Sequence, residues 1–203
     1  MHEPFYELLK RRRAVRSYTG ERVPRETLER IARAARRGPN AGYSQGLRVL
    51  VVDDPETMGA LAQPDANDEV RASWFGKAAA HFFVLTREQD YHDRYTQPDK
   101  LAITGGVEIV WPVPFWHVDA GAAMMLIMLA ALEEGLGAGV YGVIVEDDAR
   151  VRELLAIPDD LTIVVGITVG HPAADPDRDR ASSAFSRRRR AHGDVVRWNR
   201  WRP

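Results

Sequence analysis

The sequence predicts an α/β or α+β fold, in which one sheet is packed between helices. Segments with helical and with strand patterns are mixed along its 203 residues, and the helical ones hold more of the apolar residues. Residues 161–170 are apolar almost throughout, which is typical of a central strand. With 45% hydrophobic residues the chain can bury a full core, so we expect one domain over residues 1–203.

Proline and glycine mark the ends of the expected helices. Residues 3–13 are expected to form a first helix, in which Phe5, Leu8 and Leu9 make one apolar stripe. A second helix is expected to begin at Pro24 and to stop at Gly38-Pro39. Further helices are expected at 55–63, 118–134 and 147–157.

Strands are expected between these helices, at 47–52, 81–86, 137–145 and 161–170. Residues 87–116 contain a polar helical piece and then VWPVPFW, where two prolines two apart forbid a regular helix. This stretch is therefore expected to be a loop or rigid flap. Residues 187–203 are too polar to build a core and are expected to form a C-terminal arm.

Composition narrows the compartment and the kind of site. The chain has no cysteine, which fits a reducing cytoplasm, and its six histidines show no metal-ligand spacing. The longest run without a charged or strongly polar residue, 120–132, is about 13 residues long and too short to span a bilayer. The first residues contain no apolar signal-peptide core. We expect a cytoplasmic protein without metal or membrane.

Positive charge is concentrated at the two ends of a chain whose net charge is only −1. Residues 1–50 hold 12 basic and 5 acidic residues, and residues 187–203 hold 7 and 1. Because 25 of the 28 basic residues are arginine, such clusters can arise by chance. The alternative is that both ends fold onto one anionic ligand. The acidic middle disfavours a nucleic-acid-binding face.

Residues 137–142, GAGVYG, match the dinucleotide fingerprint G-x-G-x-x-G but in the wrong setting. The fingerprint needs a strand before it and a helix after it, and here the order is reversed. A glycine-rich helix stop before a strand is the simpler interpretation. The glycines also allow close backbone approach, for example by a planar ligand.

Most other notable side chains have a structural explanation. His81 lies in an apolar strand and is expected to be a core histidine, and Asp119 is most simply a helix N-cap. Trp111, Phe115 and Trp116 either line an aromatic, substrate-binding pocket or only pack the flap onto the core.

Several segments, in order, resemble the nitroreductase family of flavin enzymes. RRAVRSY at 12–18 is similar to the opening motif of that family, and GPNAGYSQGLRVLVV at 38–52 is similar to its stretch leading into the first strand. DAGAAMMLIMLAALEEGLGAGVYGV at 119–143 resembles its central helix and glycine turn, and VRELLAIPDDLTIVVGITVGHP at 151–172 its last core strand. RRRRAH at 187–192 lies where the family has a basic pair.

The resemblance implies a homodimer with a mixed sheet, helices on both sides and the long central helix at the dimer interface. FMN would lie between subunits and take hydride from NADH or NADPH, then pass it to a nitroaromatic, quinone or similar small acceptor. The chemistry would be carried by the flavin N5 atom, without a catalytic side chain.

The resemblance also assigns the cofactor-binding residues. Arg12, with Arg188 and Arg190 from the arm, would bind the FMN phosphate, which suits arginine forks. Arg13 would contact the pyrimidine or ribityl part, and Arg16 would lie near N1 and the C2 carbonyl. Backbone N–H groups of Tyr141-Gly142 would face N5. Pro39, Asn40, Ala41 and Tyr43 would come from the partner subunit.

Three departures from the family pattern leave other activities open. Ala14 replaces the usual Ser, Tyr43 the usual Asn, and Gly46-Leu47 the usual Pro-Trp. One alternative is an FMN-binding family member with different chemistry, either reductive dehalogenation or oxygen-dependent flavin breakdown. Another is a protein that binds flavin without turnover. A nucleic-acid-binding domain is the alternative outside the family.

Overall fold

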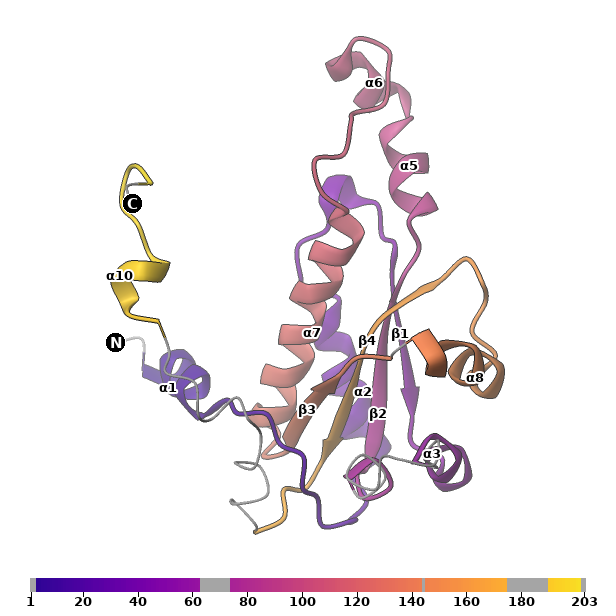
Figure 1. Cartoon of the computed structure of the whole chain (residues 1–203), viewed down its shortest axis with the longest axis vertical. Helices are drawn as coiled ribbons and strands as arrows, with labels where there is room; N and C mark the ends of the chain where they lie inside the picture. The colour runs from indigo at the N-terminus through magenta and orange to yellow at the C-terminus, as the bar shows by residue number, and fades with distance from the viewer. Residues whose placement is uncertain (1–2, 63–73, 144, 175–189, 202–203) are drawn as a thin grey trace.

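The computed structural model describes residues 3–62, 74–143, 145–174 and 190–201, and Figure 1 shows a sheet with helices around it. The helices are α1 (Glu3–Arg11), α2 (Arg25–Ala35), the 3-10 turn η1 (Ala41–Tyr43), α3 (Pro55–Ala62), α5 (Gln89–Tyr95), α6 (Pro98–Thr104), α7 (Phe115–Glu133), α8 (Val145–Leu155) and α10 (His192–Val195). The strands are β1 (Leu47–Val52), β2 (Ala80–Thr86), β3 (Gly137–Tyr141) and β4 (Thr162–Gly170).

The sheet has the strand order β1-β2-β4-β3. The prediction of an α+β fold is confirmed, and β4 lies between two other strands, as its apolar sequence predicts. The expected mixed sheet needs a correction, because all three described pairings are antiparallel. A buried strand pattern does not encode the direction of its neighbours, so the sequence could not decide this point.

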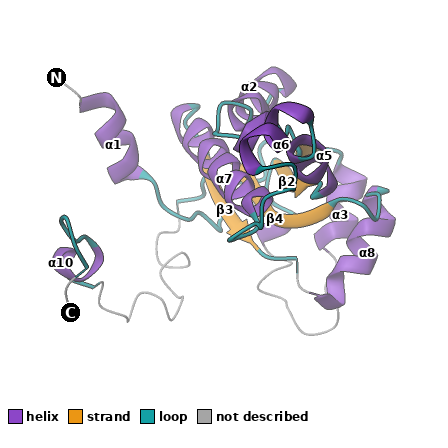
Figure 2. Ribbon diagram, turned by 90° about the horizontal axis from the view of Figure 1, so that it is seen from above, coloured by secondary structure: helices purple, strands orange, loops and turns teal. Residues whose placement is uncertain are grey.

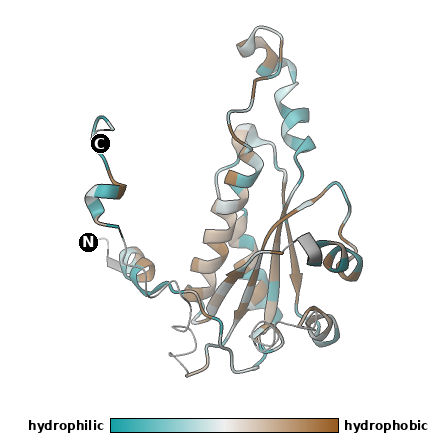
Figure 3. Ribbon diagram, in the orientation of Figure 1, coloured by the Kyte–Doolittle hydropathy of each residue, from teal (hydrophilic) through white to brown (hydrophobic). Residues whose placement is uncertain are grey.

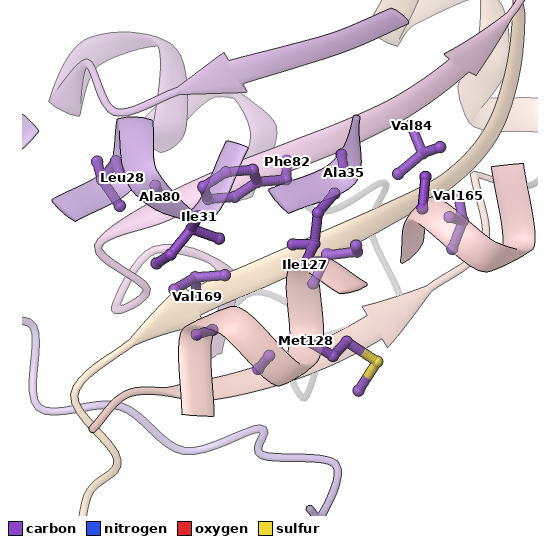
Figure 4. Packing of buried hydrophobic residues seen from close by; sticks show 14 of the residues in the cluster. Leu28, Ile31, Ala35, Ala80, Phe82, Val84, Ile127, Met128, Val165 and Val169 are labelled. Atoms are coloured by element: carbon purple, nitrogen blue, oxygen red, sulfur yellow. The ribbon is translucent and has the colours of Figure 1, made fainter. Parts of the chain in front are cut away.

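Helices cover both faces of the sheet. On one face Phe82 and Val84 of β2 pack with Ile31 of α2 and Ile127 of α7, as Figure 4 shows. On the other face the alternate β2 residue Phe83 packs in a second cluster with residues of α3 and α8, which lie across the sheet from α7 in Figure 2. Every residue of β2 is buried, because both faces of this strand are covered.

The long helix α7 is the main core helix. Its 19 residues are long and apolar enough to cross a membrane by length and composition alone, and Figure 3 shows it as largely hydrophobic. Its buried residues Ala123, Ile127 and Ala131 belong to the core cluster on the sheet, which accounts for the hydropathy of this face of the helix. The helix starts at Phe115, three residues before the predicted start, with Pro114 as N-cap. Asp119 therefore lies one turn inside the helix, and its predicted role as an N-cap is wrong.

The glycine-rich stop before β3 is confirmed. Gly135 has φ +76°, the left-handed conformation that commonly ends a helix, and β3 begins two residues later. Strand β3 ends at Tyr141, four residues before the predicted end, because the chain leaves the sheet at Gly142.

The two ends of the chain lie away from the sheet. Helices α1 and α10 are on the same side of the body in both Figure 1 and Figure 2. Residues 190–201 are exposed throughout, including Trp198 and Trp201, which are 81% and 74% exposed. The segments with concentrated positive charge thus leave the core in one direction.

Candidate functional site

The segment after α1 is pinned to the edge of the sheet. The backbone N–H of Val15 donates to the Ala138 carbonyl oxygen at 2.9 Å. The hydroxyl of Tyr18 donates to the Val15 carbonyl at 2.7 Å and lies 2.8 Å from Thr168 Oγ1. Tyr18 is only 3% exposed, and the contacts of Val15 with β3 and of Tyr18 with β4 hold the segment 12–18 at the sheet edge.

This close approach explains two glycines of the GAGVYG motif. A Cβ on Gly139 would lie 2.2 Å from the Val15 carbonyl oxygen, and a Cβ on Gly137 would lie 2.7 Å from Val15 Cγ1. The group that closely approaches the backbone of Gly137 and Gly139 is therefore the N-terminal segment of the same chain, and not the planar ligand that the sequence suggested. Gly142 differs, because nothing lies within 4 Å of its Cβ position and this end of the motif stays open.

Three arginines project from the pinned segment. Within the described part of the chain, the side chains of Arg12 and Arg13 form no hydrogen bond or ion pair. The Arg16 guanidinium lies 5.8 Å from the ring centre of Trp74. The donors of Arg12 and Arg13, which lack a carboxylate partner among the described residues, are suited to bind an anion such as phosphate. Arg190 is exposed, and Arg188 lies outside the described residues.

A buried hydrogen-bond chain fixes the last residue of β3. The Nε2 atom of His81 lies 3.2 Å from the Phe75 carbonyl oxygen and therefore donates to it. The Nδ1 atom lies 2.8 Å from the Tyr141 hydroxyl oxygen, within hydrogen-bond distance. His81 is fully buried, so the prediction of a core histidine is confirmed. The side chain of Tyr141 points inward and leaves the backbone at Gly142 exposed.

The loop from Asn40 to Gln45 has an unusual backbone. Gly42, Tyr43 and Gln45 have φ values of +60°, +61° and +58°, and two of them carry side chains that disfavour this conformation. Each such residue costs of order 1–3 kcal/mol and persists only where its surroundings hold it. The Asn40 Oδ1 atom accepts from the Gln45 N–H at 2.7 Å and closes the loop. The Tyr43 side chain is 72% exposed.

Asp119 anchors this loop to the core. Its Oδ2 atom accepts from the Ala41 backbone N–H at 2.9 Å and from the Tyr91 hydroxyl at 2.8 Å. Asp119 is only 5% exposed, and both donors compensate for its burial. Burial and the adjacent carboxylate raise the pKa of Tyr91, so its hydroxyl stays a donor at neutral pH.

A cavity of about 390 Å³ opens beside the loop. Asp119 lies in its wall, and two arginines contribute positive charge. The cavity is lined by Ala35, Arg36, Gly38, Pro39, Asn40, Tyr43, Gln45, Leu47, Arg48 and Asp119. It therefore contains three of the four residues that the resemblance assigns to the partner's flavin.

The predicted acceptor-binding residues are brought together in an aromatic cluster. The ring centre of Trp111 lies 5.8 Å from that of Trp116, 6.0 Å from that of Phe115 and 4.5 Å from that of Tyr95. Trp116 is only 9% exposed and also packs on Tyr91. Packing thus accounts for Trp116, whereas Trp111 and Phe115 are both half-buried.

A charged contact holds the proline-rich flap on α5. The Glu108 Oε1 atom accepts from the Trp111 indole N–H at 2.8 Å and lies 2.6 Å from His92 Nδ1. The hydrogen bond to Glu108 raises the pKa of His92. The Trp111 indole N–H, and then His92, lower the pKa of Glu108.

The two parts of the predicted cofactor site lie at opposite ends of α7. Asp119 holds Ala41 near the start of the helix, whereas Val15 meets Ala138 just beyond its end. From Asp119 to Glu133 the helix rises about 21 Å at about 1.5 Å per residue. Figure 1 shows the N-terminal segment at the end of α7 that is remote from α5. One chain therefore does not bring these two sets of residues together.

Sequence reasoning missed Asp119, Tyr91 and Arg94 as supports of the loop, the last through its Nε atom, which donates to the Gly42 carbonyl at 2.8 Å. The available signal was an acidic residue within an apolar helix, since such a carboxylate requires donors from elsewhere in the fold. Those donors are a tyrosine 28 residues and a backbone amide 78 residues away in sequence, and no local pattern identifies them.

Comparison with solved structures confirms the fold. The NADPH:FMN oxidoreductase of Vibrio harveyi, solved with NAD+, superimposes with a TM-score of 0.71 and 22% identity, over 98% of this chain and 78% of that chain. The FMN-dependent nitroreductase of Clostridium difficile R20291 gives a TM-score of 0.67 and 21% identity, over 96% and 98%.

Sequence comparison identifies the family. An FMN reductase [NAD(P)H] of Bacillus subtilis is 29% identical over 169 residues, which cover 79% of this chain and 63% of that protein. The FMN reductase (NADPH) of Bacillus subtilis is 26% identical over 167 residues, which cover 82% of this chain and 65% of that protein. The chain thus spans a little under two thirds of these two relatives. The model of the nitroreductase family matches residues 9–171, and the chain belongs to the nitroreductase family.

Proposed function

We propose that the chain is an FMN-dependent oxidoreductase that passes hydride from NADH or NADPH to a small acceptor, such as a nitroaromatic or a quinone. The observation that carries this proposal is the pair of arginines in the pinned segment, Arg12 and Arg13, whose side chains have no hydrogen-bond or ion-pair partner among the described residues. Family membership and the names of the two Bacillus subtilis FMN reductases support it.

The residues of this segment fit a flavin phosphate and ring. Arg12 and Arg13 would donate charge-assisted hydrogen bonds to phosphate or ribityl oxygens, with Arg188 and Arg190 approaching from the C-terminal arm. The Arg16 guanidinium would favour negative charge on the adjacent ring, and the N–H of Gly142 would donate to it. When bound, FMN supplies the hydride acceptor and donor, which no side chain of the chain can supply.

A homodimer would complete the site. Pro39, Asn40, Ala41 and Tyr43 lie near the far end of α7 from Arg12, so only those of a second copy can approach the same cofactor. Helix α7 also keeps an apolar face open to a partner. Val118 and Met125 on this face are 50% and 38% exposed. We propose that this face forms the dimer interface and that residues 187–203 act as an arm on the single domain.

Phe115, Trp111 and Trp116 would form the wall for the acceptor. Flat acceptors gain about 0.5–1.5 kcal/mol from offset stacking on aromatic rings. The absence of cysteine fits a cytoplasmic enzyme, and the proposed partners are a second copy and small molecules, without nucleic acid or membrane.

The absorption spectrum of the purified protein, before and after anaerobic addition of NADPH or NADH, tests the proposal. We expect a bound yellow chromophore that is bleached by one of the two nucleotides. A flavin that binds without bleaching would indicate binding without turnover. A colourless protein that does not quench FMN fluorescence on titration would refute the proposal.

Variants of Arg12 test the assignment of the phosphate site. Arg12→Ala should weaken FMN binding about ten- to a hundredfold, the value of one charge-assisted contact. Arg22→Ala removes an exposed arginine in the next loop and should leave FMN affinity unchanged. Equal affinities in both variants would remove Arg12 from the site.

A further inference from the structure

The loop 40–45 is a strained segment that depends on two side chains outside it. The first is Asp119 of α7, whose carboxylate accepts from the Ala41 N–H. The second is Arg94 of α5, whose Nε atom donates to the Gly42 carbonyl at 2.8 Å. A run of left-handed residues that includes Tyr43 and Gln45 persists only where such contacts over-determine it.

Helix α5 also supports the loop by shape. A Cβ on Gly42 would lie 2.5 Å from the Tyr95 ring, so the loop backbone rests directly on that ring. Arg94 is itself fixed, because its Nη atoms each lie 2.8 Å from a carboxylate oxygen of Asp99. The loop is thus held by α5 and α7 together, while the Tyr43 side chain projects outward.

We propose that Asp119 and Arg94 are positioning residues of the cofactor site. They touch no flavin themselves and act by holding residues 40–45 in the conformation in which Ala41 and Tyr43 meet the flavin of a second copy. The inference rests on the proposed function for the identity of the ligand. It adds two residues that neither the family motifs nor the sequence assigns to cofactor binding.

Asp119 also holds Tyr91, which packs on the aromatic cluster proposed as the acceptor wall. The Tyr91 hydroxyl donates to the carboxylate oxygen of Asp119 that also holds Ala41, and the Tyr91 ring packs on Trp111 and Trp116. Loss of the Tyr91 hydroxyl should therefore disturb the loop less than loss of Asp119, because the Ala41 contact remains.

Three variants and one matched control test the inference by fluorimetric FMN titration of the full chain. Arg94→Gln and Asp119→Ala should each raise the Kd for FMN by at least about tenfold, and Asp119→Asn, which keeps an oxygen acceptor, should stay within about threefold. Arg152→Gln is the control, because Arg152 likewise pairs with a carboxylate and donates to a loop carbonyl, on α8.

Hydrogen exchange of the backbone amides separates positioning from general loss of structure. Arg94 is half-buried on α5 and outside the core clusters, so Arg94→Gln should fold, with faster exchange confined to residues 41–45 and an unchanged melting temperature. Wild-type FMN affinity in both Arg94→Gln and Asp119→Ala overturns the inference and leaves the proposed function intact. Faster exchange throughout the sheet would also overturn it, because the residues would then be merely structural. If the wild-type chain binds no FMN, the proposed function fails, and the cofactor role of both residues fails with it.

Discussion

Substitution of Gly139 by alanine should detach the N-terminal segment from the sheet. The new Cβ would lie 2.2 Å from the Val15 carbonyl oxygen and 3.0 Å from Thr168 Oγ1. The nearest atom belongs to backbone, which cannot rotate away as a flexible side chain can. Relief therefore requires residues 12–18 to move away from β3, and Arg12, Arg13 and Arg16 move with them.

The expected loss of stability follows from these contacts. Forcing a methyl group into a packed position costs about 1–3 kcal/mol. Displacing the segment also breaks the Val15–Ala138 and Tyr18–Thr168 hydrogen bonds, each of which contributes about 1 kcal/mol. Alanine lowers the entropy of the unfolded chain and offsets about 0.4–1 kcal/mol. The free energy of unfolding of Gly139→Ala should thus fall by about 2–5 kcal/mol.

Urea unfolding at one fixed protomer concentration measures this change, since the stability of a dimer depends on concentration. Gly59→Ala is the matched control, because Gly59 lies in helix α3 with nothing within 4 Å of its Cβ position. The same chemical change should there stabilise the protein by up to about 1 kcal/mol. FMN titration of both variants adds the functional measurement. If Gly139→Ala were as stable as Gly59→Ala and bound FMN equally well, the pinned segment would not have the role argued for it.

Three further changes test other parts of the molecule. Phe115→Ala should raise the KM for a quinone or nitroaromatic with melting temperature and FMN content unchanged; unchanged kinetics per bound flavin would assign the ring to packing. Met125→Asp on the open face of α7 should give monomers in sedimentation velocity, while Ile103→Asp, at an 80% exposed position of α6, should not; a stable Met125→Asp dimer would place the interface elsewhere. Because the pKa of His92 is raised and that of Glu108 lowered, their contact should stabilise the fold most between the ordinary values of 4.5 and 6.5 and weaken above and below this window. Both side chains are partly exposed, so the contact contributes no more than about 1 kcal/mol. In urea unfolding, the difference in stability between wild type and His92→Gln should shrink by up to this amount from about pH 6 to about pH 8.5. A difference that grows with pH would contradict the assignment.

The regular elements could be predicted where one local signal dominates. Strand β1 has the predicted bounds, and β4 begins one residue later than predicted, because a continuous apolar run leaves few other placements. The stop of α7 at Gly135 follows from the left-handed conformation that glycine accepts. Direction of pairing was not predictable, because an apolar strand with both faces covered is equally compatible with either direction.

The candidate site was predictable only in part, for a related reason. The arginines at 12–16 and the glycines at 137–139 are marked by composition, but the contact between them is long-range and appears only when the chain is folded. The left-handed backbone at Tyr43 and Gln45 contradicts local preference and is stabilised by residues up to 78 positions away. Departures from local preference are expected at functional sites, where the surrounding fold compensates for them.

These two observations bear on the concentration of charge at the ends of the chain. Surface arginines commonly pair with carboxylates on the same surface. Arg30 pairs with Glu134 in this way, and Arg87 pairs with Asp90 and Asp160. Arg12 and Arg13 do not do so within the described residues, although the chain carries 29 acidic residues. Separation of these arginines from the acidic residues costs favourable pairing, and such an arrangement is explained when an anion supplies the missing charge. Chance clustering does not explain the lack of carboxylate partners, whereas under the proposed function a bound phosphate would supply the missing charge. Gly137 and Gly139 are explained by the close approach of Val15, which holds the segment in place.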